Sequence, residues 1–241
     1  MKNFISYIRI VFLSGCAMAV THTALAQSDD FQARRPGAST EVYEPSAFDL
    51  KYDACLAQIT QNAEDAYEMA LQWSDDGGGY RAEHCTALSL FALERKKLAA
   101  LRLQKLAEEG YGFSEKKRAD FYQEAADFWL LFGAPKKAYQ LTTAALKDHP
   151  YHTDLRITRA RAYAALGHYD YATTDLGIAL RFAPRRADAY RYRADAYYQQ
   201  GQYDNALKDI NTSFELDPEQ VETAFVRGQI LEAIRREKAE K

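Results

Sequence analysis

Apolar and small side chains return at the same positions every 34 residues in the second half of the chain. Within each unit they are spaced as on one face of a helix, and they predict two amphipathic helices joined by a tight turn. The units cover residues 119–152, 153–186 and 187–220. A period of this length in helix-forming sequence predicts an all-α solenoid, in which each helix pair packs on its neighbours.

The positions that recur most strictly each have a physical role in a helix pair. Small side chains such as Ala194 and Ala206 come from opposite helices and let the two axes approach. Gly201 ends the first helix, because the left-handed backbone conformation costs glycine little. Pro218 ends the second helix, because proline lacks the amide hydrogen that a helix interior requires. Tyr197, one turn beyond the small residue, is predicted to fill the space between units.

This order of small, bulky, glycine and proline positions resembles the tetratricopeptide repeat (TPR). The resemblance implies a right-handed superhelix of helix pairs whose concave face binds peptides or protein segments. It also implies where a partner is met, because ligands of the family contact outward positions of the first helix of each unit. In this sequence those positions are Gln123, Asp127, Ile157, Arg161, Arg191, Tyr192, Asp195, Tyr198, Phe225 and Gln229. The family's clamp for C-terminal carboxylates is not expected, because the comparable positions lack its Lys, Asn and Arg.

Less regular helical sequence flanks the three repeats on both sides. Residues 49–118 carry apolar positions at helical spacing, but Glu94 stands where the repeats have their turn glycine. Residues 221–241 predict a single capping helix with a charged tail, which gives the solenoid a polar end. We therefore expect about three well-formed and one or two degenerate helix pairs, followed by a capping helix.

Residues 1–26 have the pattern of a secretory signal peptide. Basic Lys2 and Arg9 precede an apolar run that is too short to span a bilayer, and an A-x-A site precedes Gln27. Cleavage before Gln27 would export the protein to the periplasm. The polar residues 27–48 are then predicted to form a flexible linker.

A second interpretation of the N-terminal segment involves a lipid anchor. The residues Leu-Ser-Gly-Cys that end at Cys16 resemble a bacterial lipobox, in which the cysteine is lipidated and becomes the new N-terminus. The mature protein would then be an envelope assembly factor tethered to a membrane through Cys16. The first residue of the mature chain distinguishes the two interpretations.

The charge balance excludes nucleic acid as an expected partner. Loss of Lys2 and Arg9 with the signal leaves 29 basic and 34 acidic residues, a formal charge of about −5. Such a balance does not attract a polyanion. No segment long and apolar enough for a membrane span is evident elsewhere in the sequence.

Two cysteines, Cys55 and Cys85, remain after the signal segment. In an exported chain an even pair of cysteines usually forms a disulfide. Their separation of 30 residues is within one helical turn of the repeat period, and equivalent first helices of adjacent units lie side by side. We therefore predict a structural disulfide between Cys55 and Cys85.

We find no set of residues that predicts catalysis, a cofactor or a metal site. His149 and His152 flank Pro150 in a turn between repeats, but no third ligand follows at a recognisable spacing. We expect them to be surface histidines. A glycan- or metal-binding accessory protein that uses these histidines and the tyrosines is the alternative from another functional class.

Charged positions recur together and predict structural ion pairs. Arg159, Arg193 and Arg227 share one register, as do Asp175 and Asp209. The sequence leaves open whether Arg193 meets Asp209 in its own unit or Asp175 in the preceding one. Taken together, these patterns predict an exported interaction scaffold that holds a protein or peptide partner without chemistry.

Overall fold

The computed structural model describes residues 45–240, and every regular element in this range is an α-helix. The predictions for the signal segment and Cys16, and for the linker as far as residue 44, lie outside the described residues. The helices are α2 (Ala47–Gln61), α3 (Ala63–Asp75), α4 (Gly79–Ala92), α5 (Lys96–Glu109), α6 (Glu115–Leu131), α7 (Pro135–Asp148), α8 (Thr153–Ala165), α9 (Tyr169–Phe182), α10 (Ala187–Gln199), α11 (Tyr203–Leu216) and α12 (Val221–Ala239).

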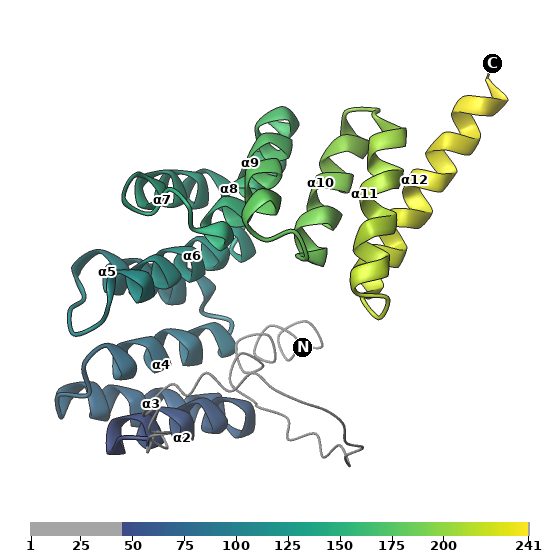
Figure 1. The fold of residues 1–241 in the computed structure, drawn as a ribbon. Coiled ribbons are helices and arrows are strands. Elements are labelled where there is room, and N and C mark those ends of the chain that lie inside the picture. Colours follow the sequence, from purple (N-terminus) through teal and green to yellow (C-terminus); the bar gives the residue numbers. More distant parts are fainter. Residues whose placement is uncertain (1–44, 241) are drawn as a thin grey trace, which may run out of the picture.

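The helices form an elongated and curved array that runs from α2 to α12 in chain order (Figure 1). Each helix packs on the next, and successive first helices such as α8 and α10 also contact one another. Five helix pairs are thus followed by one capping helix, so the predicted helix-pair solenoid is confirmed. The first helix of the described residues begins at Ala47, so the last two residues of the predicted linker, 47 and 48, are helical.

Left-handed residues end the first helix of the regular units. Gly133, Gly167 and Gly201 have φ angles of 86°, 80° and 72°. The residue after each glycine donates its amide to a carbonyl five residues earlier, as His168 does to Tyr163 at 2.9 Å. Glu94 occupies the same place in the degenerate pair α4–α5 and has a φ of 60°, so a side-chain-bearing residue takes the strained conformation there.

Replacing Glu94 by glycine is expected to raise the melting temperature by about 2–4 °C, because relief of the left-handed strain outweighs the added freedom of the unfolded chain. Gly167→Ala should lower it by a similar amount, since a Cβ at Gly167 would meet nothing within 4 Å and only the backbone would be strained. Glu94→Ala is the matched control, because it removes the ion pair with Lys96 and keeps the strain. Equal melting temperatures for Glu94→Ala and Glu94→Gly would contradict this account.

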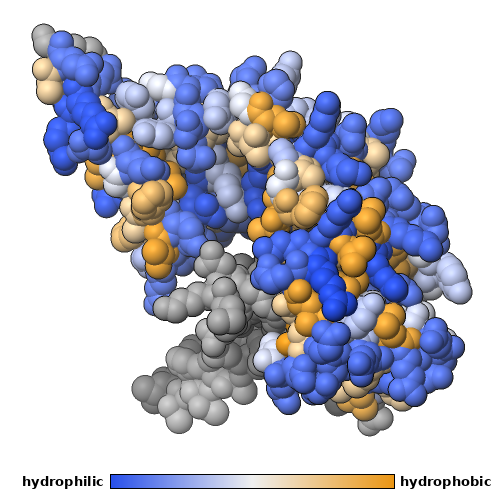
Figure 2. Space-filling model, turned by 180° about the vertical axis from the view of Figure 1, so that it is seen from behind, coloured by the Kyte–Doolittle hydropathy of each residue, from blue (hydrophilic) through white to orange (hydrophobic). Residues whose placement is uncertain are grey.

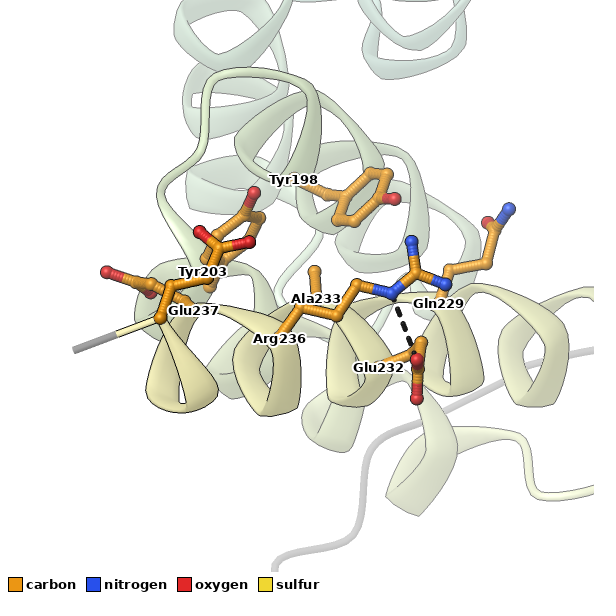
Figure 3. A pocket seen from close by; sticks show the side chains of 8 residues that line it. Tyr198, Tyr203, Gln229, Glu232, Ala233, Arg236 and Glu237 are labelled. Carbon is orange, nitrogen blue, oxygen red and sulfur yellow. Dashed lines mark hydrogen bonds and ion pairs between the residues drawn. The ribbon is translucent and has the colours of Figure 1, made fainter.

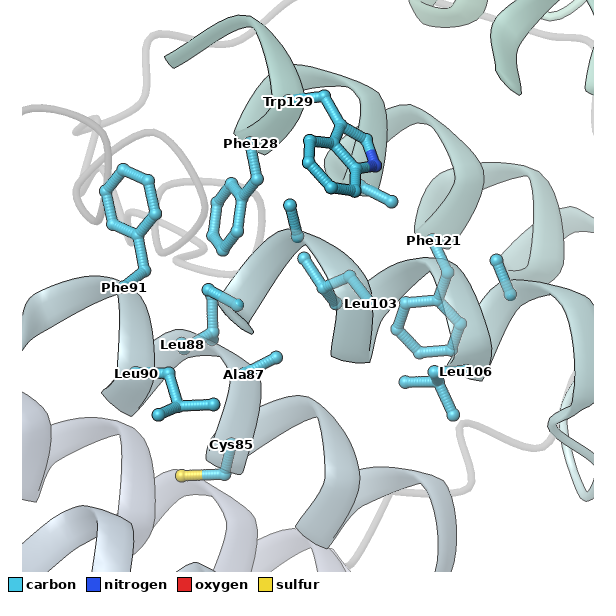
Figure 4. Packing of buried hydrophobic residues seen from close by; sticks show 14 of the residues in the cluster. Cys85, Ala87, Leu88, Leu90, Phe91, Leu103, Leu106, Phe121, Phe128 and Trp129 are labelled. Carbon is cyan, nitrogen blue, oxygen red and sulfur yellow. The ribbon is translucent and has the colours of Figure 1, made fainter. Parts of the chain in front are cut away.

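The core changes character along the array. The N-terminal half is packed with large aromatic side chains, among them Phe121, Phe128 and Trp129, which are at most 2 % exposed (Figure 4). In the two C-terminal units the predicted small pairs provide the contact, and Ala194 and Ala206 are fully buried. Small side chains at these contacts allow the first and second helices of each unit to pack closely.

The predicted disulfide between Cys55 and Cys85 is present and joins α2 to α4. The two Cα atoms are 6.4 Å apart, within the range that a disulfide allows. The bridge ties the first helix of the most degenerate pair to the first helix of the next.

The ion pairs form within each unit, which settles the register that the sequence leaves open. Arg193 donates two hydrogen bonds to Asp209, at 2.6 and 2.9 Å, and Arg159 does the same to Asp175. Each pair joins the first helix of a unit to the second. Arg227, on the last described helix, α12, donates instead to Asn211 of the preceding helix α11, at 2.9 Å.

The face of the molecule seen in Figure 2 is mostly hydrophilic, with separate apolar patches. Within residues 45–240, no helix combines the length and the apolar character that a membrane crossing needs.

Candidate functional site

A row of polar and aromatic side chains follows the first helices from α6 to α12. Asp127 accepts a hydrogen bond from Arg161 at 2.6 Å, and the Arg161 guanidinium lies 5.2 Å from the centre of the Tyr192 ring. Arg191 lies over the same ring at 4.2 Å and donates to Gln220, the residue that precedes α12, at 3.0 Å. The row thus links α6, α8 and α10 through positions that the family resemblance assigns to ligand contact, and it reaches the start of α12 through Gln220.

At the α6 end of this row, contacts within the protein already bury predicted side chains. The Asp127 side chain is 7 % exposed, and it accepts hydrogen bonds from Gln123 and Thr158 as well as from Arg161. Burial raises the pKa of Asp127, although the Arg161 guanidinium and the Thr158 hydroxyl oppose the shift. Ile157 is 4 % exposed and packs in the core of its unit, which makes it a packing residue rather than a partner contact. The expected groove is therefore shorter than the sequence predicts.

The row opens into a first depression, which we call the central hollow, between α8, α9 and α10. Its volume is about 300 Å³. Arg161, Tyr192 and Asp195, three of the predicted contact residues, line it. Burial raises the pKa of Asp195, although Gln199 and Arg191 oppose the shift. The remaining wall consists of Ala160, Ala164, Ala165, Tyr169, Leu176 and Gln199.

A second depression, the C-terminal hollow, lies between α10, α11 and α12 (Figure 3). Its volume is about 510 Å³. Two further predicted residues, Tyr198 and Gln229, line it. The other lining residues are Tyr203, Glu232, Ala233, Arg236, Glu237 and Glu240. Both hollows therefore lie where one helix pair meets the next helix, and both receive side chains from first helices.

The family model of the tetratricopeptide repeat matches residues 187–220, the unit formed by α10 and α11. The fold is a TPR solenoid. No curated protein matches the chain in sequence.

Solved TPR structures share this fold at low sequence identity. The thermophilic TPR protein TTC0263 of Thermus thermophilus has 16 % identity and a TM-score of 0.61, with 77 % of this chain and 99 % of that chain covered. YrrB, a TPR protein with an unusual peptide-binding site, has 16 % identity and a TM-score of 0.56 over 77 % of this chain and all of its own. MamA of AMB-1 has 17 % identity and a TM-score of 0.54, with 70 % and 99 % covered.

Sequence reasoning missed the contributions of second helices and, in the capping helix, predicted Gln229 but not the charged residues that follow it. Tyr169 and Tyr203 begin α9 and α11, and each lines a hollow. They are identical residues at the same position of two successive units, so the repeat pattern of the sequence could have identified them. Phe225, in contrast, is 66 % exposed and lines neither hollow. It stays a predicted contact outside the two depressions.

A buried chain of hydrogen bonds links the first helices at the other end of the solenoid. The Tyr52 hydroxyl on α2 contacts His84 Nδ1 on α4, and His84 Nε2 lies 2.6 Å from Glu124 Oε2 on α6. A neutral imidazole protonated at Nε2 satisfies both bonds. Burial raises the pKa of Tyr52, which keeps its hydroxyl protonated as the donor. The three groups line neither hollow, so we regard them as a structural link between units.

One of the two histidines considered for a metal site, His152, has structural contacts of its own. His152 Nδ1 accepts the amide of Leu155 at 3.3 Å and so caps α8, while Nε2 lies 3.1 Å from Asp120. No group of three His, Cys, Asp or Glu side chains within residues 45–240 is placed to hold a metal ion. The geometry therefore lends no support to metal binding by His149 and His152.

Proposed function

We propose that this protein is an exported, non-enzymatic interaction scaffold that binds a protein or peptide segment along the first helices of residues 153–240. The observation that carries the proposal is the pair of hollows at successive unit junctions, into which five predicted contact residues converge. They are Arg161, Tyr192, Asp195, Tyr198 and Gln229.

The composition of these hollows suits a peptide better than a small substrate. Tyrosine and arginine are the side chains that most often dominate binding energy at protein interfaces. Both hollows are open depressions, and α10 lines both of them, because it contributes Tyr192 to one and Tyr198 to the other. An extended segment can therefore occupy both at once.

Export is part of the proposal and rests on two features. The first 26 residues have the layout of a secretory signal with a cleavage site before Gln27. The Cys55–Cys85 disulfide supports an oxidising compartment such as the periplasm. Attachment to a membrane through a lipid on Cys16 is the alternative form of the same proposal.

To test the groove, a photo-crosslinking amino acid at Gln229 should capture the partner in intact cells, whereas one at Tyr111 should not. Both positions are exposed, but Tyr111 lies in the loop between α5 and α6 and lines neither hollow. The captured protein, once identified and purified, provides the ligand for affinity measurements.

Tyr198→Ala and Arg191→Ala are each expected to weaken binding of that partner by roughly 1–3 kcal/mol and to leave thermal unfolding nearly unchanged. Ala194→Leu is the matched variant on the packing side of the same helix. It should destabilise the fold by roughly 1–3 kcal/mol, because Ala194 is fully buried and the contact has no room for a larger side chain. Normal partner binding by both Tyr198→Ala and Arg191→Ala would place the binding surface elsewhere.

A further inference from the structure

The two hollows occupy equivalent places in successive units. Tyr169 lines the central hollow and Tyr203, 34 residues later, lines the C-terminal hollow. Asp195 and Gln229 are related in the same way. The repeat therefore builds the same depression twice, and only the side chains that differ between the copies can make the two hollows select different groups.

Those differences concern aromatic surface and charge. The small Ala164 of the central hollow is replaced by Tyr198 in the C-terminal hollow. The formal charges that line the central hollow, Arg161 and Asp195, cancel. The C-terminal hollow has three carboxylates and one guanidinium, a formal balance of −2, from Glu232, Arg236, Glu237 and Glu240.

The lining of the C-terminal hollow is arranged as a receptor for an organic cation. The Tyr198 and Tyr203 rings are 5.9 Å apart and tilted by 46°, and both lie beside α12, where Glu237 is next to Tyr203 and the Arg236 side chain lies between Tyr198 and Glu232 (Figure 3). A cation over the face of a tyrosine ring is attracted by the negative potential of the ring. Carboxylates beside the rings add a direct electrostatic attraction.

The arginine in the hollow does not cancel this attraction. Arg236 donates to Glu232 at 3.0 Å, and Arg235, which lies outside the hollow, donates to the same carboxylate at 2.6 Å. The side chains of Arg236, Arg235 and Glu232 are 74 %, 77 % and 43 % exposed. An ion pair at this exposure contributes little and exchanges readily with other partners. A ligand cation can therefore share or replace Arg236 beside Glu232.

We propose that the C-terminal hollow binds the lysine or arginine side chain of a basic partner segment. The proposal rests on the proposed scaffold function and specifies the partner's chemistry at one of its two hollows. Charge complementarity selects a basic segment over a neutral or acidic one. The two tyrosine rings favour the alkyl-bearing cation of a side chain over a metal ion, which prefers a shell of oxygen ligands.

The test uses the full mature chain, labelled with ¹⁵N, and four blocked pentapeptides Gly-Ala-X-Ala-Gly in which X is Lys, Arg, Gln or Glu. The Lys and Arg peptides should shift the amide signals of residues 198–203 and 229–240 in a saturable manner. The Gln and Glu peptides should not. Equal shifts from the Gln or Glu peptide, or no saturable shift from Lys and Arg, would overturn the proposal.

Two pairs of matched variants locate the effect. Tyr203→Leu should weaken binding of the Lys peptide by about 2- to 30-fold, which is the range of a cation–π contact, whereas the equivalent Tyr169→Leu should not. The triple variant Glu232→Gln, Glu237→Gln, Glu240→Gln should lose the preference for Lys over Gln. The control Glu68→Gln, Glu215→Gln, Glu219→Gln removes the same charge from exposed residues outside both hollows and should keep that preference.

If the control triple variant also lost the preference for the Lys peptide over the Gln peptide, only the net charge of the protein would attract the peptide, and the proposal would be wrong. Circular dichroism of each variant establishes that it is folded before its affinity is interpreted. The scaffold function is tested separately, by the dependence of the captured partner on Tyr198 and Arg191. A partner that requires those residues but binds the two triple variants equally well would leave the scaffold function standing and refute the cation site.

Discussion

Replacing Arg193 by methionine is expected to lower the free energy of unfolding by about 3–5 kcal/mol, the usual cost of removing one partner from a buried ion pair. Arg193 donates two hydrogen bonds to Asp209, whose side chain is only 6 % exposed. Methionine keeps the unbranched stem of the arginine but leaves the carboxylate buried without its charged partner. Chemical denaturation of the variant measures the loss.

Two further variants separate this effect from a general loss of packing. Arg193→Met combined with Asp209→Leu should recover most of the lost stability, because no buried charge then remains unpaired. Arg235→Met is the exposed control, since the Arg235 side chain is 77 % exposed and pairs with Glu232, three residues earlier. It should change stability by less than about 1 kcal/mol. A double variant as unstable as Arg193→Met alone would contradict a dominant role for the charge pair.

The fold was predictable because the repeat states the same physical constraints several times. α10 ends just before Gly201 and α11 ends just before Pro218, as the backbone preferences of glycine and proline predict. The N-terminal pairs lack this redundancy. The glycine run 77–79 suggests a turn, but α4 already begins at its last residue, Gly79. The φ angle of Gly79 is 58°, so the helix starts from a residue in the left-handed conformation. A glycine in a sequence indicates a flexible backbone, but it does not tell whether a helix ends before the glycine or begins at it.

The pairing of charges needed the structure. From the sequence, Asp175 and Asp209 are both within reach of Arg193, and the repeat makes the two choices look alike. The helices α10 and α11 of one unit place Arg193 against Asp209. The link from Tyr52 through His84 to Glu124 was equally hidden, because it joins three units whose residues recur at no fixed spacing.

The candidate site was predicted in part. The family pattern assigned ligand contacts to first helices, and five of those positions do line the hollows. It assigned Ile157 as well, which the packing of α8 buries in the core. The pattern also left out Tyr203 and Glu237, because the C-terminal hollow takes all of its lining residues except Tyr198 from the second helix and from the helix that follows. The periodic pattern describes the residues of a single unit, whereas each hollow is lined by residues of two successive units.

Removing the Cys55–Cys85 disulfide is expected to destabilise the N-terminal helix pair by roughly 3–4 kcal/mol, because the bridge closes a loop of 30 residues in the unfolded chain. In a solenoid each unit contacts only its neighbours, so the loss should be local. Amide hydrogen exchange of the variant Cys55→Ala, Cys85→Ala should accelerate in α2 and α3 and stay unchanged in α10 and α11. The same experiment on the reduced wild-type protein controls for the two side-chain replacements.

The position of the bridge gives the reason for expecting a local effect of this size. α2 is the first described helix of the array, and among the described helices it packs on α3 and α4. The disulfide and the contact between Tyr52 and His84 both join α2 to α4, and Cys85 directly follows His84. Loss of the bridge should therefore loosen the buried link to Glu124 as well. Exchange that accelerates equally in α2 and in α11 would show that the solenoid unfolds as one unit, and unchanged exchange in α2 and α3 would show that packing alone holds them.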